Sequence, residues 1–155
     1  QTLDAQCAQP NNLDANHATL PAVFEYLIGN TDWSIPVLHN IFLVQTVHTI
    51  YPVAYDFDFS GVVKARYAAP DPKLGITQVT QRFYRGSCAT VDEIPAVLEH
   101  VRSQREAILA IVGEPIGLDE RNARRVRDFV GDFFEALERP DRVRDTMAAR
   151  CVPVR

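Results

Sequence analysis

The sequence predicts one α+β domain, mostly helical, in which a β-hairpin carries a group of polar residues. Three observations support this prediction. The 155 residues suit a single domain with a sizeable core. With 46% hydrophobic and 23% charged residues, the composition is that of a globular chain and excludes a disordered or collagen-like one. Apolar residues recur at helical spacing in the second half, and the first half holds two short strand-like runs.

The first half of the chain predicts one helix and the hairpin. Residues 1–17 are polar and lack periodicity, so we expect a loop or arm there. A helix is expected over residues 19–28, and Gly29 ends it, as glycine commonly does at helix ends. Two apolar runs, 41–44 and 50–55, are typical of strands, and the short polar stretch between them favours a hairpin turn.

The second half predicts three helices. Thr90 and Glu93 have the spacing of a capping box, and the helix behind them is expected to run to Gly113. A second helix is expected over residues 119–138, where a Phe-rich stripe indicates burial in the core. A short last helix is expected over residues 141–149.

Charge and hydropathy argue against two classes of partner. The net charge of −4 argues against a nucleic-acid binder with a basic surface. The chain has no run of about 18 apolar residues, so the sequence predicts no membrane span. It starts with Gln rather than Met and lacks a leader pattern. We therefore expect either an exported bacterial protein whose signal peptide has been removed, or part of a longer chain.

The three cysteines are Cys7, Cys88 and Cys151, and their spacing matches neither a zinc site nor a CxxC motif. If the protein is exported, a bridge between Cys88 and Cys151 is expected, with Cys7 left over. Three reduced or buried thiols are an equally good reading of the sequence.

Polar side chains gather around the predicted hairpin in the segment 29–61. Asp32 lies on the loop before the first strand, Asn40 at the start of that strand, and Asp56 and Asp58 at the end of the second. In an antiparallel hairpin these positions share one end of the ladder, so we expect Asp32, Asn40 and Asp56 to converge. Asp58 would leave the opposite face of a regular strand from Asp56, unless the chain bends after Asp56.

This combination of acids and an amide is suited to phosphoryl transfer. Hard divalent cations prefer carboxylate and carbonyl oxygens as ligands. An ion held between such groups and a nucleotide neutralises phosphate charge, while another acid orients the attacking hydroxyl. Asp56 is the first choice as metal ligand.

Three stretches of this segment resemble the catalytic core of the CotH-like (spore coat protein H) atypical protein kinases. They are NTDWS at residues 30–34, HN at residues 39–40 and YDFDFSG at residues 55–61. The segment is similar, more distantly, to HipA-type and lipid kinases, and also to a group of uncharacterised exported bacterial proteins.

The resemblance implies a role for each polar residue. Asp32 corresponds to the catalytic acid, Asn40 and Asp56 correspond to residues that bind ATP and its metal, and Asp58 assists with the metal. The implied cofactors are Mg²⁺ or Mn²⁺ and ATP, and the implied acceptor is a protein.

Several features depart from ordinary kinases. Asp32 and Asn40 are eight residues apart rather than five, Asn30-Thr31 stands where His-Arg is usual, and DFD stands for DFG. Neither a glycine-rich phosphate loop nor a strand lysine precedes the segment. We therefore expect residues 18–155 to form a kinase-like C-lobe, with the missing N-terminal lobe supplied by an earlier part of the same, longer chain.

A second function class remains open from the sequence: a non-catalytic exported binding or structural domain, such as a pseudokinase or a helical interaction domain. In that case Asp32 and Asn40 are turn residues. His39 is either a donor to phosphate or a neutral histidine bonded to backbone. Arg82 and Arg85 either contact an anionic ligand or lie on a solvated face, which is the favoured reading.

Overall fold

Five α-helices and one two-stranded antiparallel sheet make up the fold of the described residues, so the predicted mixed α+β class is confirmed. The computed structural model describes residues 13, 15–114 and 117–153. The elements are α1 (Ala15–Ile28), β1 (Ile41–Gln45), β2 (Ile50–Ala54), the 3₁₀-helices η2 (Pro72–Leu74) and η3 (Cys88–Glu93), α2 (Ile94–Ser103), α3 (Arg105–Gly113), α4 (Glu120–Ala136) and α5 (Pro140–Ala148).

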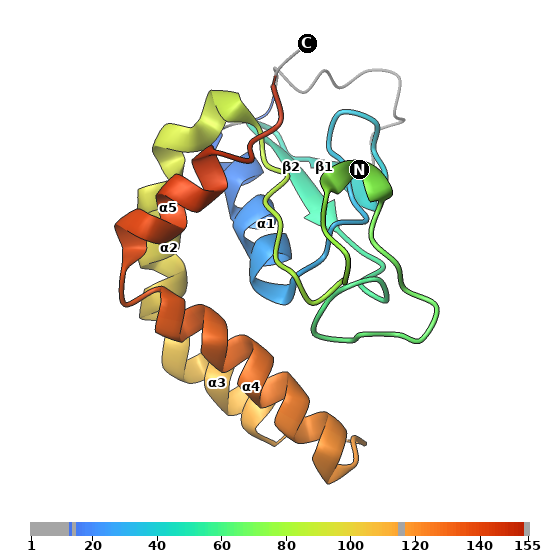
Figure 1. Ribbon diagram of the computed structural model, residues 1–155. Helices are drawn as coiled ribbons and strands as arrows, with labels where there is room; N and C mark the ends of the chain where they lie inside the picture. Colours follow the sequence, from blue (N-terminus) through green and yellow to red (C-terminus); the bar gives the residue numbers. More distant parts are fainter. Residues whose placement is uncertain (1–12, 14, 115–116, 154–155) are drawn as a thin grey trace.

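Helix α1 lies at the centre, between the β-hairpin on one side and α2 and α5 on the other (Figure 1). It begins at Ala15, so residues 15–17 of the predicted arm are helical. Neither glycine nor proline separates these residues from the helix that follows, and nothing in the sequence stops its extension. The rest of that arm, apart from residue 13, lies outside the described residues. Gly29 ends α1 with a φ of 70°, as the sequence predicted.

The core is a single cluster of buried apolar side chains around α1. It includes Val23, Leu27, Trp33, Ile41, Leu43, Tyr84, Ile94, Leu98, Val130, Phe133, Phe134 and Met147. The Phe-rich stripe of α4 thus packs into the core, as predicted.

Strands β1 and β2 pair from Ile41 with Ala54 to Gln45 with Ile50, in agreement with the predicted hairpin. Ile41 and Leu43 are buried while Phe42 is half exposed, which is the alternation of a strand with one face on the core. The hairpin therefore fixes one edge of the polar site against the core.

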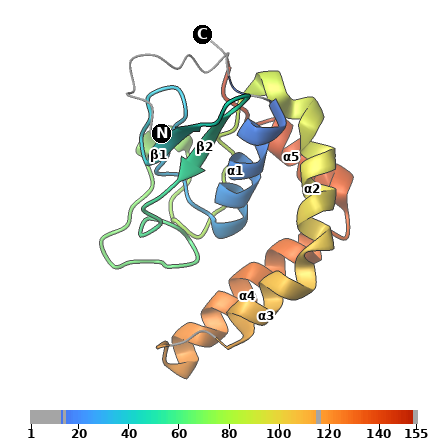
Figure 2. The same ribbon diagram turned by 180° about the vertical axis from the view of Figure 1, so that it is seen from behind.

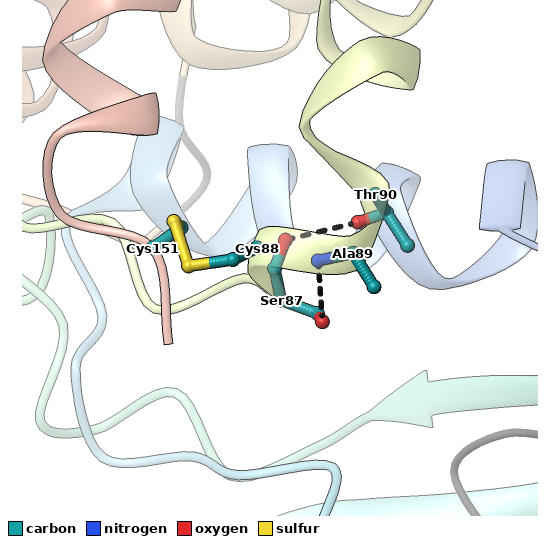
Figure 3. The surroundings of a disulfide bond; sticks show 5 residues. All are labelled: Ser87, Cys88, Ala89, Thr90 and Cys151. Atoms are coloured by element: carbon teal, nitrogen blue, oxygen red, sulfur yellow. Dashed lines mark hydrogen bonds between the residues drawn. A yellow bond between two sulfur atoms is a disulfide. The ribbon is translucent and has the colours of Figure 1, made fainter. Parts of the chain in front are cut away.

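The predicted helix behind the capping box is wrong in two respects. It is broken into α2 and α3 at Gln104, whose φ of −94° and ψ of 6° are not helical. The Ser103 hydroxyl donates to the His100 carbonyl at 2.6 Å, so at the break this carbonyl accepts a side-chain hydrogen bond that competes with the helical backbone one. Thr90 is not the cap either, because Ser87 accepts the Ala89 N–H at 3.1 Å and starts η3 (Figure 3).

Helices α3 and α4 form a pair that extends away from the rest of the fold in both views (Figures 1 and 2). Asp119 caps α4 by accepting the Asn122 N–H at 2.9 Å, and this hydrogen bond lowers the pKa of the Asp119 carboxyl. None of the helices in the described part of the chain is long and apolar enough to cross a membrane.

A disulfide joins Cys88, at the start of η3, to Cys151, just after α5 (Figure 3). The backbone reinforces it: the Cys88 N–H donates to the Val152 carbonyl at 2.9 Å, and the Val152 N–H donates to the Gly86 carbonyl at 2.8 Å. The bridge decides between the two readings of the sequence for this pair, while Cys7 lies outside the described residues.

Replacing Cys88 and Cys151 together by serine is expected to lower the free energy of unfolding by about 4 kcal/mol, because the bridge closes a loop of 63 residues in the unfolded chain. Urea denaturation without reductant measures the loss. As a control, reductant should destabilise the wild type and leave the double variant unchanged. A wild type whose midpoint is insensitive to reductant would contradict the prediction.

Candidate functional site

Buried polar groups form hydrogen bonds with the backbone of the loop that carries Asp32. The Asp32 N–H donates to Asn30 Oδ1 at 3.0 Å, and the Asn30 N–H donates to the Glu25 carbonyl at 2.8 Å. Asn30 and Thr31 are buried, and the Arg85 guanidinium donates to the Thr31 carbonyl. The backbone on which Asp32 stands is therefore held by its neighbours on two sides.

Asn40 joins this loop to the hairpin. Its Nδ2 donates to the Asp32 carbonyl at 2.7 Å and to Asp32 Oδ2 at 3.2 Å, and its own carbonyl accepts the Tyr55 N–H at 3.1 Å. Both partners on Asp32 are acceptors, so the carboxamide must present its nitrogen to them. The oxygen, Oδ1, makes no hydrogen bond within the described residues. The backbone of Asn40 has a φ of 53°, which is left-handed, a conformation that Asn tolerates better than most residues.

His39 takes a partner that the sequence did not predict. Its Nε2 lies 2.9 Å from Asp32 Oδ1, and the two side chains are 53% and 39% exposed. The hydrogen bond is therefore to the side chain of Asp32 rather than to backbone. No signal in a single sequence pairs residues seven apart across an irregular loop.

Asp56 lies at the end of β2, where a φ of 60° bends the chain sharply. The bend ends the alternation of a regular strand and brings the Asp58 carboxyl and backbone amide to the Asp56 carboxylate. The pKa of Asp56 is raised, chiefly by the side-chain hydrogen-bonding interaction with Asp58 and next by the charges of Asp58 and Asp32. The Asp56 and Asp58 carboxyl groups therefore interact. The sequence predicted opposite faces for them unless the chain bends after Asp56.

Asp58 has a further partner that sequence reasoning missed. The hydroxyl of Tyr67 donates to Asp58 Oδ2 at 2.8 Å, and this interaction raises the pKa of the tyrosine. Tyr67 lies in an exposed loop nine residues further on, where periodicity carries no information.

An exposed aromatic pair borders the acids. Phe42 and Tyr55 stack with their ring centroids 4.2 Å apart and an angle of 19° between the planes. The two residues are 51% and 37% exposed; Phe42 lies on β1, and Tyr55 follows β2 and precedes Asp56. A flat apolar surface therefore lies beside a polar one.

The described side chains offer few ligands for the predicted metal. In the part of the chain that the structure describes, no three His, Cys, Asp or Glu side chains are placed to hold an ion by themselves. Mg²⁺ at nucleotide sites needs less from the protein, because it takes one or two carboxylates and completes its shell with phosphate and water. Asp56 and Asp58, whose carboxyl groups interact with each other, can supply the one or two carboxylates of that second arrangement.

The solvated face favoured for Arg82 and Arg85 is wrong. Arg82 donates to the carbonyls of Leu27 and Phe129, and its guanidinium lies 3.9 Å from the centroid of the Phe129 ring. Burial lowers the pKa of both arginines. Both side chains are half-buried, and each donates to a backbone carbonyl at or just after the end of α1, that of Leu27 for Arg82 and that of Thr31 for Arg85.

Comparison of the chain with protein-family models, with curated proteins and with solved structures finds no match. The geometry of the site therefore carries the functional argument.

Glu25, on α1, is fully buried, and its carbonyl accepts the Asn30 N–H of the loop that carries Asp32. Neither of its carboxyl oxygens makes a hydrogen bond of normal geometry within the described residues. Desolvation raises its pKa from 4.5 to about 7, and the nearby Asn30 side chain offsets only part of this. The native state therefore binds a proton that the unfolded chain releases between these two values.

We expect the wild type to lose about 3 kcal/mol of stability as the pH rises from 4.5 to about 7, because the folded pKa is the higher one. Glu25→Gln removes the ionisable group and should remove this slope. Denaturation at a series of pH values measures it. The exposed Glu135→Gln is the control and should keep the wild-type slope. Wild type and Glu25→Gln curves that stay parallel across this range would contradict the prediction.

Proposed function

We propose that this chain is the C-lobe of a kinase-like phosphotransferase of the CotH type, which transfers phosphate from metal-bound ATP to a hydroxyl. One observation carries the proposal. Asn40 binds Asp32 through its nitrogen, which leaves its oxygen without a partner among the described residues, and the charges of Asp32 and Asp58 both act on Asp56. An acid for the acceptor and a set of oxygen ligands for a metal thus meet at one end of the hairpin.

In this proposal Asp32 accepts the proton of the acceptor hydroxyl. The acceptor oxygen then forms a bond to the γ-phosphorus, the bond from that phosphorus to the β–γ bridging oxygen breaks, and ADP leaves with the electron pair. Asn40, Asp56 and Asp58 would hold Mg²⁺ or Mn²⁺, which when bound neutralises charge on the phosphates.

The surface beside the acids supports a nucleotide as the phosphate donor. The stacked rings of Phe42 and Tyr55 offer an apolar face for a planar base, since base–aromatic stacking is favourable and tolerant of base identity. Asp32 and Asp56 are solvent-accessible, so a bulky acceptor such as a protein hydroxyl can reach them. The N-terminal lobe that the resemblance implies stays a prediction.

We also propose that the protein is exported. The Cys88–Cys151 disulfide supports this compartment, since disulfides persist in oxidising surroundings and are rare in the cytosol.

A non-catalytic exported binding or structural domain is the second candidate. The observation in its favour is that both carboxylate oxygens of Asp32 have partners inside the chain, His39 and Asn40, as in a structural residue. The two candidates differ in whether the acids recognise metal and ATP together.

The first test is the thermal unfolding of the full-length protein that contains this chain, with Mn²⁺ and ATP. At about 100 times the dissociation constant, a ligand stabilises the folded state by about 2.7 kcal/mol, which raises the midpoint by several degrees in a domain of this size. Asp56→Ala should lose the shift, because it removes the carboxylate that is the first choice as metal ligand. The exposed Asp92→Ala, on η3, is the matched control and should retain it.

A shift that survives in Asp56→Ala, or no shift in the folded wild type, would contradict the kinase-like proposal. A shift with Mn²⁺ alone that ATP does not increase would favour the non-catalytic binding domain.

A further inference from the structure

The His39 ring holds one oxygen of the Asp32 carboxylate. Its Nε2 lies 2.9 Å from Oδ1, and a carboxylate oxygen only accepts, so Nε2 carries the proton in this contact. The Asn40 Nδ2 donates to the other oxygen, Oδ2, at 3.2 Å. Each oxygen of Asp32 therefore has its own donor, and rotation of the carboxylate about its terminal bond would break both hydrogen bonds.

The backbone around His39 distinguishes this contact from an ordinary surface ion pair, which contributes little to stability. Ser34 and His39 form an isolated antiparallel bridge, with the Ser34 N–H donating to the His39 carbonyl at 2.9 Å and the His39 N–H to the Ser34 carbonyl at 3.0 Å. Leu38 and Asn40, on either side of His39, have φ values of 51° and 53°. Non-glycine residues adopt this left-handed conformation at a cost, and it persists only where the surroundings enforce it.

We infer that His39 is a positioning residue for Asp32, holding the carboxylate in the orientation in which it receives the acceptor proton. The inference rests on the proposed phosphotransferase function and assigns no contact between His39 and ATP. An acid that is free to rotate would present its lone pairs to the acceptor for only part of the time, and fixed geometry is what a general base requires. His39 should therefore affect turnover and leave nucleotide binding unchanged.

The test uses the full-length protein that contains this chain and compares His39→Leu, which cannot donate, with His39→Gln, whose side-chain amide can donate to the same oxygen. His48→Leu is the matched control, since His48 is exposed in the hairpin turn. Mg²⁺-dependent formation of ADP from ATP, with water or the chain's own hydroxyls as acceptor, gives kcat and KM. Thermal unfolding with and without Mn²⁺ and ATP reports folding and binding independently of activity.

We expect His39→Leu to lower kcat roughly tenfold, the loss that corresponds to one oriented hydrogen bond, with KM for ATP and the Mn²⁺–ATP shift unchanged. His39→Gln should recover most of the kcat, and His48→Leu should match the wild type. Wild-type kcat in His39→Leu, or His39→Gln as slow as His39→Leu, would overturn the positioning role while the proposed function stands. A wild type that shifts with Mn²⁺ and ATP but forms no ADP would overturn this role and the catalytic role of Asp32 together. A wild type with neither shift nor ADP would overturn the proposed function itself.

Discussion

The hydrogen bonds from the Asn40 carboxamide to Asp32 are the contact on which the site depends. Through them the irregular loop after α1 is attached to the hairpin, and the Asn40 carbonyl attaches the same residue to the end of β2. A left-handed backbone at Asn40 makes the arrangement possible, because it turns the carboxamide back over the loop while the chain continues into β1.

The support beneath this contact is more polar than a core usually is. Glu25 and Asn30 are fully buried, and Arg82 and Arg85 are half-buried against backbone carbonyls at and after the end of α1. Burying such groups costs stability unless they are paired, so their presence in the core is easier to explain by the loop that they hold than by the stability of the fold. The disulfide and the aromatic packing of α4 then supply stability at a distance from the site.

Much of the fold could be predicted from the sequence because it follows from periodicity. The hairpin and α4 have alternating or helical patterns, and antiparallel pairing then implies that Asn40 and Asp56 lie at the same end of the hairpin. The places where a single side chain or backbone angle interrupts those patterns could not be predicted from periodicity. The break at Gln104, the capping by Ser87 and the bend at Asp56 each depend on one side chain or one φ angle. The contacts of Asp32 with His39 and of Asp58 with Tyr67 depend on irregular loops whose course no residue pattern encodes.

The mutual charge of the acids near the hairpin favours binding of a cation whose remaining ligands come from outside the chain. The charges of Asp58 and Asp32 both act on the Asp56 carboxyl and raise its pKa. Arg85 interacts electrostatically with Asp71 and Asp32, whereas the charges that act on the Asp56 carboxyl are those of Asp58 and Asp32. Like charges at this range repel, and a divalent cation would turn the repulsion into attraction. Because no three acidic, histidine or cysteine side chains converge among the described residues, the protein offers such an ion an incomplete shell. Under the proposed function the phosphates of ATP complete it, so metal and nucleotide would bind together more tightly than either binds alone.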